Sequence, residues 1–131
     1  MKKILVLLLL MVSTNVFAEW TRVTESADGD MTAYIDFGTI KRKGNKVKMW
    51  VFTDFKTVQK VENYRYLSEM RRYEYDCKEE TSRQLDIYFY SGNMKQGEIV
   101  VSAKNIKIDE ATSILPGSID ETLFKITCSK K

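Results

Sequence analysis

Histidine is absent from this 131-residue sequence, and cysteine and proline occur only twice and once. Without histidine the chain lacks the commonest general base and the commonest transition-metal ligand, and a histidine-ligated haem is excluded. Two cysteines alone cannot complete a structural zinc site, which takes four ligands. We therefore expect no catalytic residues, no metal and no resident cofactor, and we expect that the protein is not an enzyme.

A strong excess of charge is also lacking. Lys and Arg number 21 against 18 Asp and Glu, a formal net charge of +3 that falls to +1 without Lys2 and Lys3. Duplex binding is driven by many contacts between cations and phosphates. A nucleic-acid partner is therefore not expected.

The N-terminus carries the features of a secretory signal peptide. Met1-Lys2-Lys3 is a positive start, residues 4–12 form an apolar run, and Val16-Phe17-Ala18 fits a cleavage site. The alternative is a retained N-terminal anchor, but the run is shorter than the roughly 20 residues of a spanning helix. We expect residues 1–18 to be the signal peptide and residues 19–131 to form one domain without a transmembrane segment.

The expected export from the cytoplasm determines the chemistry expected of the cysteines. No cysteine lies near residue 18, so the chain is not expected to be a lipoprotein, and its location is periplasmic or secreted. In an oxidising compartment a disulfide between Cys77 and Cys128 is the default. It would close a loop whose chain entropy is worth roughly 4 kcal/mol. A redox pair of free thiols is the alternative, but the CxxC spacing is absent.

Alternating apolar residues and turn signals predict about six strands in an α+β fold with an antiparallel sheet. Residues 57–63 are ambiguous and read as a loop. Ser118 and Glu121 have capping-box spacing, and Ile119, Leu123 and Ile126 predict a C-terminal helix packed on one face of the sheet. Cys128 falls off this apolar stripe, so the helix is expected to end or distort before it, with the disulfide tethering its end. The expected strands cover residues 20–24, 31–37, 47–55, 64–77, 85–91 and 99–103.

Several short motifs give the chain a resemblance to a known family. They are Trp20, Tyr34-Ile35-Asp36, Val47-Lys48-Met49-Trp50, Glu74-Tyr75-Asp76-Cys77, Pro116-Gly117-Ser118 and Cys128, in that order. In this pattern the chain resembles the surface-adhesin protein E family of Gram-negative bacteria. The resemblance implies a six-stranded sheet with a disulfide-tethered helix, and binding of host matrix proteins or a haem-like ligand.

Two groups of residues are candidate partner contacts. Lys41, Arg42 and Lys43 precede Gly44-Asn45, and they are either a contact for an acidic partner or a soluble hairpin tip that guards a sheet edge. Tyr88 and Tyr90 lie on the strand face opposite Leu85, Ile87 and Phe89, where they either meet a partner or are covered by the fold.

These observations predict a non-catalytic exported binding module, with a protein partner and self-association into a homodimer as the expected interactions. The alternative is an exported inhibitor or accessory factor of an envelope enzyme. Asp28, Asp30 and Asp36 could supply calcium ligands, but the EF-hand spacing is absent and a turn explains the first two.

The signal-peptide assignment makes a direct prediction. Protein isolated from the envelope or the medium should begin at Glu19 and carry no acyl group, because Ala18 ends the cleavage motif and no lipid-accepting cysteine follows it. Intact-mass spectrometry measures both properties. A mass that includes residues 1–18 or an added lipid would contradict the assignment.

Overall fold

All strand pairings form one antiparallel sheet in the computed structural model, which describes residues 20–106 and 111–129. The sheet order is β1-β2-β4-β5-β6-β7, while β3 pairs with the start of β4 and β8 with the start of β6. The predicted signal peptide lies outside the described residues. The strands are β1 (Thr21–Glu25), β2 (Met31–Ile35), β3 (Lys41–Lys43), β4 (Lys46–Val61), β5 (Tyr64–Asp76), β6 (Thr81–Tyr90), β7 (Ile99–Ala103) and β8 (Thr112–Ser113).

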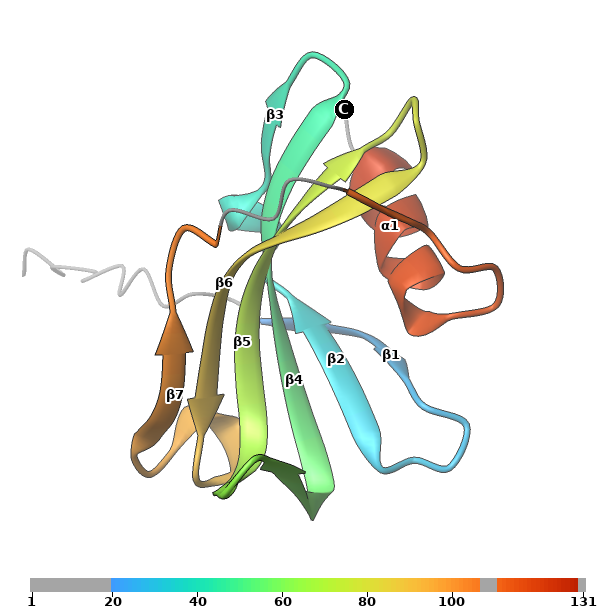
Figure 1. Cartoon of the computed structure of the whole chain (residues 1–131). Helices are drawn as coiled ribbons and strands as arrows, with labels where there is room; N and C mark the ends of the chain where they lie inside the picture. Colours follow the sequence, from blue (N-terminus) through green and yellow to red (C-terminus); the bar gives the residue numbers. More distant parts are fainter. Residues whose placement is uncertain (1–19, 107–110, 130–131) are drawn as a thin grey trace, which may run out of the picture.

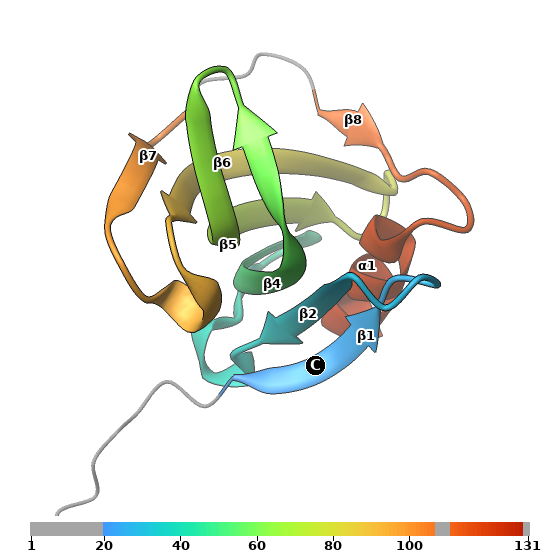
Figure 2. The same ribbon diagram turned by 90° about the horizontal axis from the view of Figure 1, so that it is seen from below.

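A single α-helix among the described residues, α1 (Ile119–Ser129), packs against one face of this sheet. The sheet curves so that α1 lies within its concave side (Figures 1 and 2). Two short 3-10 helices, η1 (Phe37–Thr39) and η2 (Asn93–Lys95), connect strands. The predicted α+β class, with an antiparallel sheet and one disulfide-tethered C-terminal helix, is confirmed.

Alternation along β4 divides the sheet into two faces. We call the face toward α1 the inner face and the opposite one the outer face. Because successive side chains of a strand point to opposite sides, residues 47, 49, 51, 53 and 55 share the inner face. Their side chains are buried there, whereas Trp50 and the fully buried Phe52 lie on the outer face. The core comprises Ala33, Ile35, Met49, Val51, Tyr75, Leu123 and Phe124.

The start of α1 follows the predicted capping pattern. Ser118 Oγ accepts a hydrogen bond from the Glu121 backbone N–H at 3.1 Å. The apolar stripe then buries Leu123 and Phe124 fully and Ile119 and Ile126 partly. Burying one such side chain stabilises the fold by roughly 1.5–3 kcal/mol. This stripe fixes which side of α1 meets the sheet.

The end of α1 differs from the prediction. The helix continues through Cys128 to Ser129 without ending early. Cys77 follows the end of β5 at the rim of the sheet, so a cysteine beside the apolar stripe can reach it with a Cα–Cα distance of 5.7 Å. The Cys128 carbonyl, one of the last of the helix, accepts a hydrogen bond from Arg42 Nη2 at 3.0 Å.

Two strand boundaries also differ, and one strand contains a bulge. Residues 57–61, expected in a loop, belong to β4, which passes a register shift between Asp54 and Gln59 and pairs with β5 to its end. β6 begins at Thr81, before the predicted start at residue 85, because Thr81 and Ser82 pair with both β5 and β8. Leu85 lies at a bulge: Asp86 pairs with Arg72 and Gln84 with Tyr73, so Leu85 has no opposite residue in β5.

The disulfide between Cys77 and Cys128 is formed as predicted, and it generates a stability prediction. Replacing both cysteines by Ser should lower the free energy of unfolding by about 2–5 kcal/mol, because the unfolded chain is no longer cross-linked over a separation of 51 residues. Urea unfolding of the oxidised protein and the double variant measures the difference. Equal stabilities, or free thiols in the native protein, would contradict the prediction.

Candidate binding surfaces

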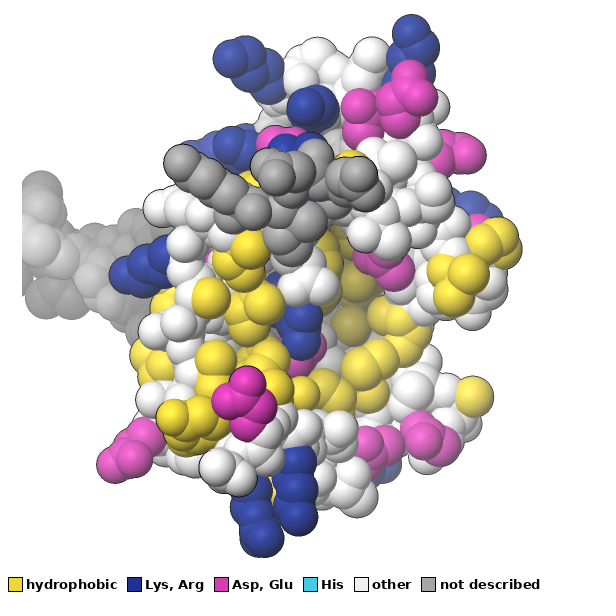
Figure 3. Space-filling model, in the orientation of Figure 1, with side chains coloured by type: hydrophobic (Ala, Val, Ile, Leu, Met, Phe, Trp, Pro, Cys, Tyr) yellow, Lys and Arg dark blue, Asp and Glu magenta, His cyan; other side chains and the backbone are white. Residues whose placement is uncertain are grey.

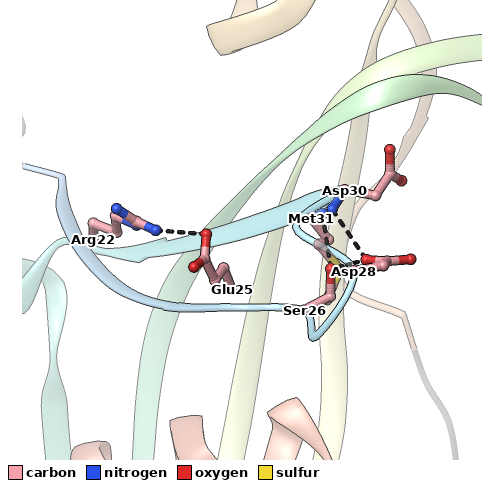
Figure 4. A network of polar contacts seen from close by, with 6 residues as sticks. All are labelled: Arg22, Glu25, Ser26, Asp28, Asp30 and Met31. Carbon is pink, nitrogen blue, oxygen red and sulfur yellow. Dashed lines mark hydrogen bonds and ion pairs between the residues drawn. The ribbon is translucent and has the colours of Figure 1, made fainter.

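The carboxylates of the turn between β1 and β2 accept hydrogen bonds from neighbouring residues of the same chain (Figure 4). Asp28 Oδ1 accepts hydrogen bonds from Ser26 Oγ at 2.5 Å and from the Asp30 N–H at 3.0 Å, and these bonds lower the pKa of Asp28. Asp30 Oδ1 accepts from the Thr57 N–H and hydroxyl, and Asp36 Oδ1 accepts from the Gly38 N–H. Within the described residues no group of three or more acidic or cysteine side chains could hold a metal ion.

The inner face is hollowed beside α1. A cavity of about 460 Å3 lies between the helix and strands β4–β6, with Val51, Ile119 and Leu123 among its apolar walls. Seen from the helix side, hydrophobic side chains surround this hollow and charged side chains lie within it (Figure 3). No candidate contact from the sequence analysis lines this cavity.

A group of charged and polar side chains on the inner face forms a hydrogen-bonded network around Arg71. Arg71 Nε and Nη2 donate to the two carboxylate oxygens of Glu69 at 3.0 and 3.1 Å, and Nη1 donates to Gln84 Oε1 at 2.9 Å. Burial alone would lower the pKa of Arg71, but the Glu69 carboxylate outweighs burial and the pKa is raised. The guanidinium also lies 5.3 Å from the Phe89 ring centroid. Because its charge is already paired, Arg71 stabilises the sheet and is not available to a ligand. Arg83 also lines the cavity, and its buried Nε has no hydrogen-bond partner among the described residues.

Two stacked tyrosines connect this network to α1. Tyr73 and Tyr75 have ring centroids 5.9 Å apart, and Tyr75 Oη donates to Asp120 Oδ1 at 2.8 Å. Burial raises the pKa of Tyr73 to about 12, while Arg71 lowers it and Glu69 adds to the rise. Burial and the Asp120 charge raise the pKa of Tyr75 as well. Both phenols therefore serve the fold in their neutral form.

The outer face carries the predicted tyrosine pair. Tyr88 pairs with Met70 and Tyr90 with Ser68, positions that face away from α1. Both tyrosines are half-buried. The Tyr88 ring centroid lies 6.2 Å from that of Trp50, and burial, followed by the neighbouring Tyr88, raises the pKa of Tyr90. The helix does not cover this face, so Tyr88 and Trp50 form a shared aromatic surface.

The basic hairpin is divided between the two faces. Lys41 lies directly opposite Lys48, and Lys43 opposite Lys46, on the outer face with Trp50. Arg42 lies opposite Val47 on the inner face, where it donates to the end of α1. The structure therefore brings Lys41 and Lys43 onto the same face as Tyr88 and Tyr90, and it separates Arg42 from them.

Other cations lie against the aromatic rings of the outer face, and the sequence analysis missed their role. Arg72 Cζ lies 5.7 Å from the Trp50 ring centroid and pairs with Asp86, and Lys104 Nζ lies 6.0 Å from that of Tyr88. Lys95 Nζ lies 4.7 Å from the Trp20 ring centroid. Partial burial lowers the pKa of Lys95, which the Asp36 charge partly offsets. Period-two alternation could have placed Arg72 beside Trp50, but not Lys95 or Lys104, which lie outside the strands.

Comparison with known proteins identifies the family of this chain. A family model described as surface-adhesin protein E matches residues 20–129. The chain belongs to the surface-adhesin protein E family. No curated protein matches the sequence. Within the described part of this protein E family member, no helix combines the length and hydrophobicity needed to span a bilayer.

Solved structures similar to this protein E family member share its fold. Crystal form II of Haemophilus influenzae protein E has a TM-score of 0.61 and 18% identity, covering 88% of this chain and 91% of that chain. A second Haemophilus influenzae protein E structure has a TM-score of 0.59 and 18% identity, covering 88% of each chain. Protein E from non-typeable Haemophilus influenzae has a TM-score of 0.53 and 18% identity, covering 88% of this chain and 79% of that chain.

The raised pKa values predict alkaline destabilisation. Folding holds Tyr73 neutral up to about pH 12, whereas in the unfolded chain its pKa is 10.0. The stabilisation is therefore complete below pH 10 and is lost as the pH rises toward 12, at about 1.4 kcal/mol per pH unit for each such tyrosine. Urea midpoints across this range should fall less steeply for Tyr73→Phe than for the parent. The exposed Tyr64 supplies the control variant Tyr64→Phe, and an equal slope for both variants would contradict the assignment.

Proposed function

We propose that this protein E family member is a non-catalytic exported binding module that contacts its partner through the outer face of its sheet. The observation that carries the proposal is the convergence of Trp50, Tyr88, Lys41 and Lys48 on a face that α1 leaves uncovered. Aromatic side chains bordered by cations are typical of protein interaction surfaces.

The inner face supports this assignment by contrast. Arg71 is paired with Glu69, Tyr75 donates its hydroxyl proton to Asp120, and the cavity adjoins the helix that completes the core. The pairing of Arg71 with Glu69 and Gln84 leaves this face the role of scaffold. The outer face is therefore the surface available to a partner.

The partner expected from the family is a macromolecule of the extracellular matrix, met by a protein that has been exported. Export is supported by the N-terminal pattern and by the disulfide, which oxidising compartments maintain. A released or periplasmic module of this kind needs no active site, because a rigid sheet that presents a fixed set of side chains is sufficient for binding.

The tyrosine pair provides the test. Tyr88→Ala combined with Tyr90→Ala should weaken binding to a matrix protein by more than about 2 kcal/mol, because aromatic anchors dominate interfaces. Lys41→Gln combined with Lys43→Gln should mainly slow association and flatten its salt dependence. Surface plasmon resonance against a panel of purified matrix proteins measures both effects.

The control separates loss of an anchor from loss of any exposed ring. Tyr64, which is 49% exposed at the turn between β4 and β5, supplies the variant Tyr64→Ala, which should bind like the parent. If binding survives the Tyr88 and Tyr90 changes but is lost in Tyr64→Ala, the contact lies at the turn between β4 and β5 and not on the outer face. Absence of binding to every panel member would contradict a matrix partner.

A further inference from the structure

The outer face near β3 combines flat aromatic rings with a dense group of cations. Trp50 and Tyr88 lie side by side with an interplanar angle of 34°. A depression of about 250 Å3 adjoins Trp50, with Lys41, Lys48 and Arg72 in its wall. We name this group the cationic shelf, and it consists of Trp50, Tyr88, Lys41, Lys48, Arg72 and Lys104.

Lysines of β3 and β4 lie opposite one another although their positive charges repel. Lys41 opposes Lys48 and Lys43 opposes Lys46, and like charges directly across a strand pair are destabilising. Of these four side chains only Lys46 forms an ion pair within the described residues, to Glu74 at 3.9 Å. Neighbouring residues of one face are about 7 Å apart along a strand and about 5 Å apart across it. On the other side of β4, Glu74 lies opposite Lys48 and Asp76 opposite Lys46. Lys41, Lys43 and Lys48 nevertheless form no ion pair among the described residues, so these exposed lysines remain available to an anion.

The aromatic rings decide between classes of anion. Trp50 and Tyr88 are half-buried, and their ring centroids lie 6.2 Å apart, so the two rings form one aromatic surface and do not project as separate exposed side chains. A small inorganic anion would use the lysines and leave the rings without a contact. A charged sugar can contact both the rings and the lysines, because its C–H faces pack on aromatic rings while its anionic substituents pair with cations.

We propose that the cationic shelf binds a sulfated glycan chain, with sugar rings on Trp50 and Tyr88 and sulfate groups at Lys41 and Lys48. The density of positive charge favours a sulfated chain over a polymer with one carboxylate per sugar. Arg72 is already paired with Asp86, and its guanidinium lies 5.7 Å from the Trp50 ring centroid. This inference rests on the proposed function, because it names the chemical group that the outer face recognises on its partner.

Isothermal titration calorimetry with a size-defined heparin oligosaccharide tests the proposal, with oligogalacturonate and dextran as the carboxylated and neutral comparisons. The parent should bind heparin more tightly than oligogalacturonate and should not bind dextran. Lys41→Gln combined with Lys48→Gln should weaken heparin binding by roughly threefold to tenfold, since each exposed charge contact contributes up to about 1 kcal/mol. Trp50→Ala should weaken it by a similar factor and should also weaken oligogalacturonate binding.

A matched charge pair at the other end of the same two strands supplies the control. Lys60 lies directly opposite Arg65, both are exposed, and Lys60→Gln combined with Arg65→Gln removes the same charge. This control should bind heparin like the parent. An equal loss in both double variants would show attraction to charge alone and overturn the proposal, as would preferential binding of oligogalacturonate.

The result also separates this inference from the proposed function. If heparin does not bind while a matrix protein still binds through Tyr88 and Tyr90, the glycan assignment fails and the outer face remains the contact. If neither heparin nor a matrix protein binds the outer face, both fail. Circular dichroism of each variant establishes that Trp50→Ala is folded, and the lysine variants test the proposal independently of that ring.

Discussion

The register between β4 and β5 is the constraint on which both faces of the molecule depend. Val47 opposes Tyr75 and Val51 opposes Arg71 on the inner side, whereas Trp50 opposes Arg72 on the outer side. Because side chains alternate along each strand, one pairing register assigns every residue to its face at once. The buried core beside α1 and the aromatic surface away from it are two consequences of the same hydrogen-bonded ladder.

The C-terminal helix is held to this sheet by three kinds of contact. Leu123 and Phe124 enter the core, the disulfide joins Cys128 to the residue after β5, and Arg42 bonds the last turn of the helix to β3. Near the start of the helix, Tyr75 donates a hydrogen bond to Asp120, so the orientation of α1 is fixed at both ends. The helix therefore closes one side of the sheet and leaves the other side open to partners.

Much of this arrangement could be predicted from local pattern. The apolar pattern of residues 47–55 identified a strand of the sheet, and the spacing of Ser118 and Glu121 marked the start of the helix. Alternation also placed Tyr88 and Tyr90 away from the core. The same alternation places Arg42 on the opposite face from Lys41 and Lys43, although their shared charge had suggested one group of three.

The remaining features depend on contacts that a single strand does not encode. The bulge at Leu85 depends on the pairing of β6 with β5, and the disulfide of a cysteine within the helix depends on where the fold places Cys77. Lys95 contacts the Trp20 ring from η2. Met94 and Lys95 of this helix both have positive φ, a backbone conformation that the pattern of side chains does not predict. The neighbourhood of Trp50 and Tyr88 likewise requires knowing that β5 separates their strands.

The length of β4 has a consequence for how this protein can diverge in sequence. β4 pairs with β2, β3 and β5, so its 16 residues set the alignment of most of the sheet. A one-residue insertion near its centre would exchange the sides of all the residues that follow it, sending core side chains outward and Trp50 or Phe52 inward. Related chains should therefore accommodate length changes in the turns on either side of β4 or at its existing register shift between Asp54 and Gln59.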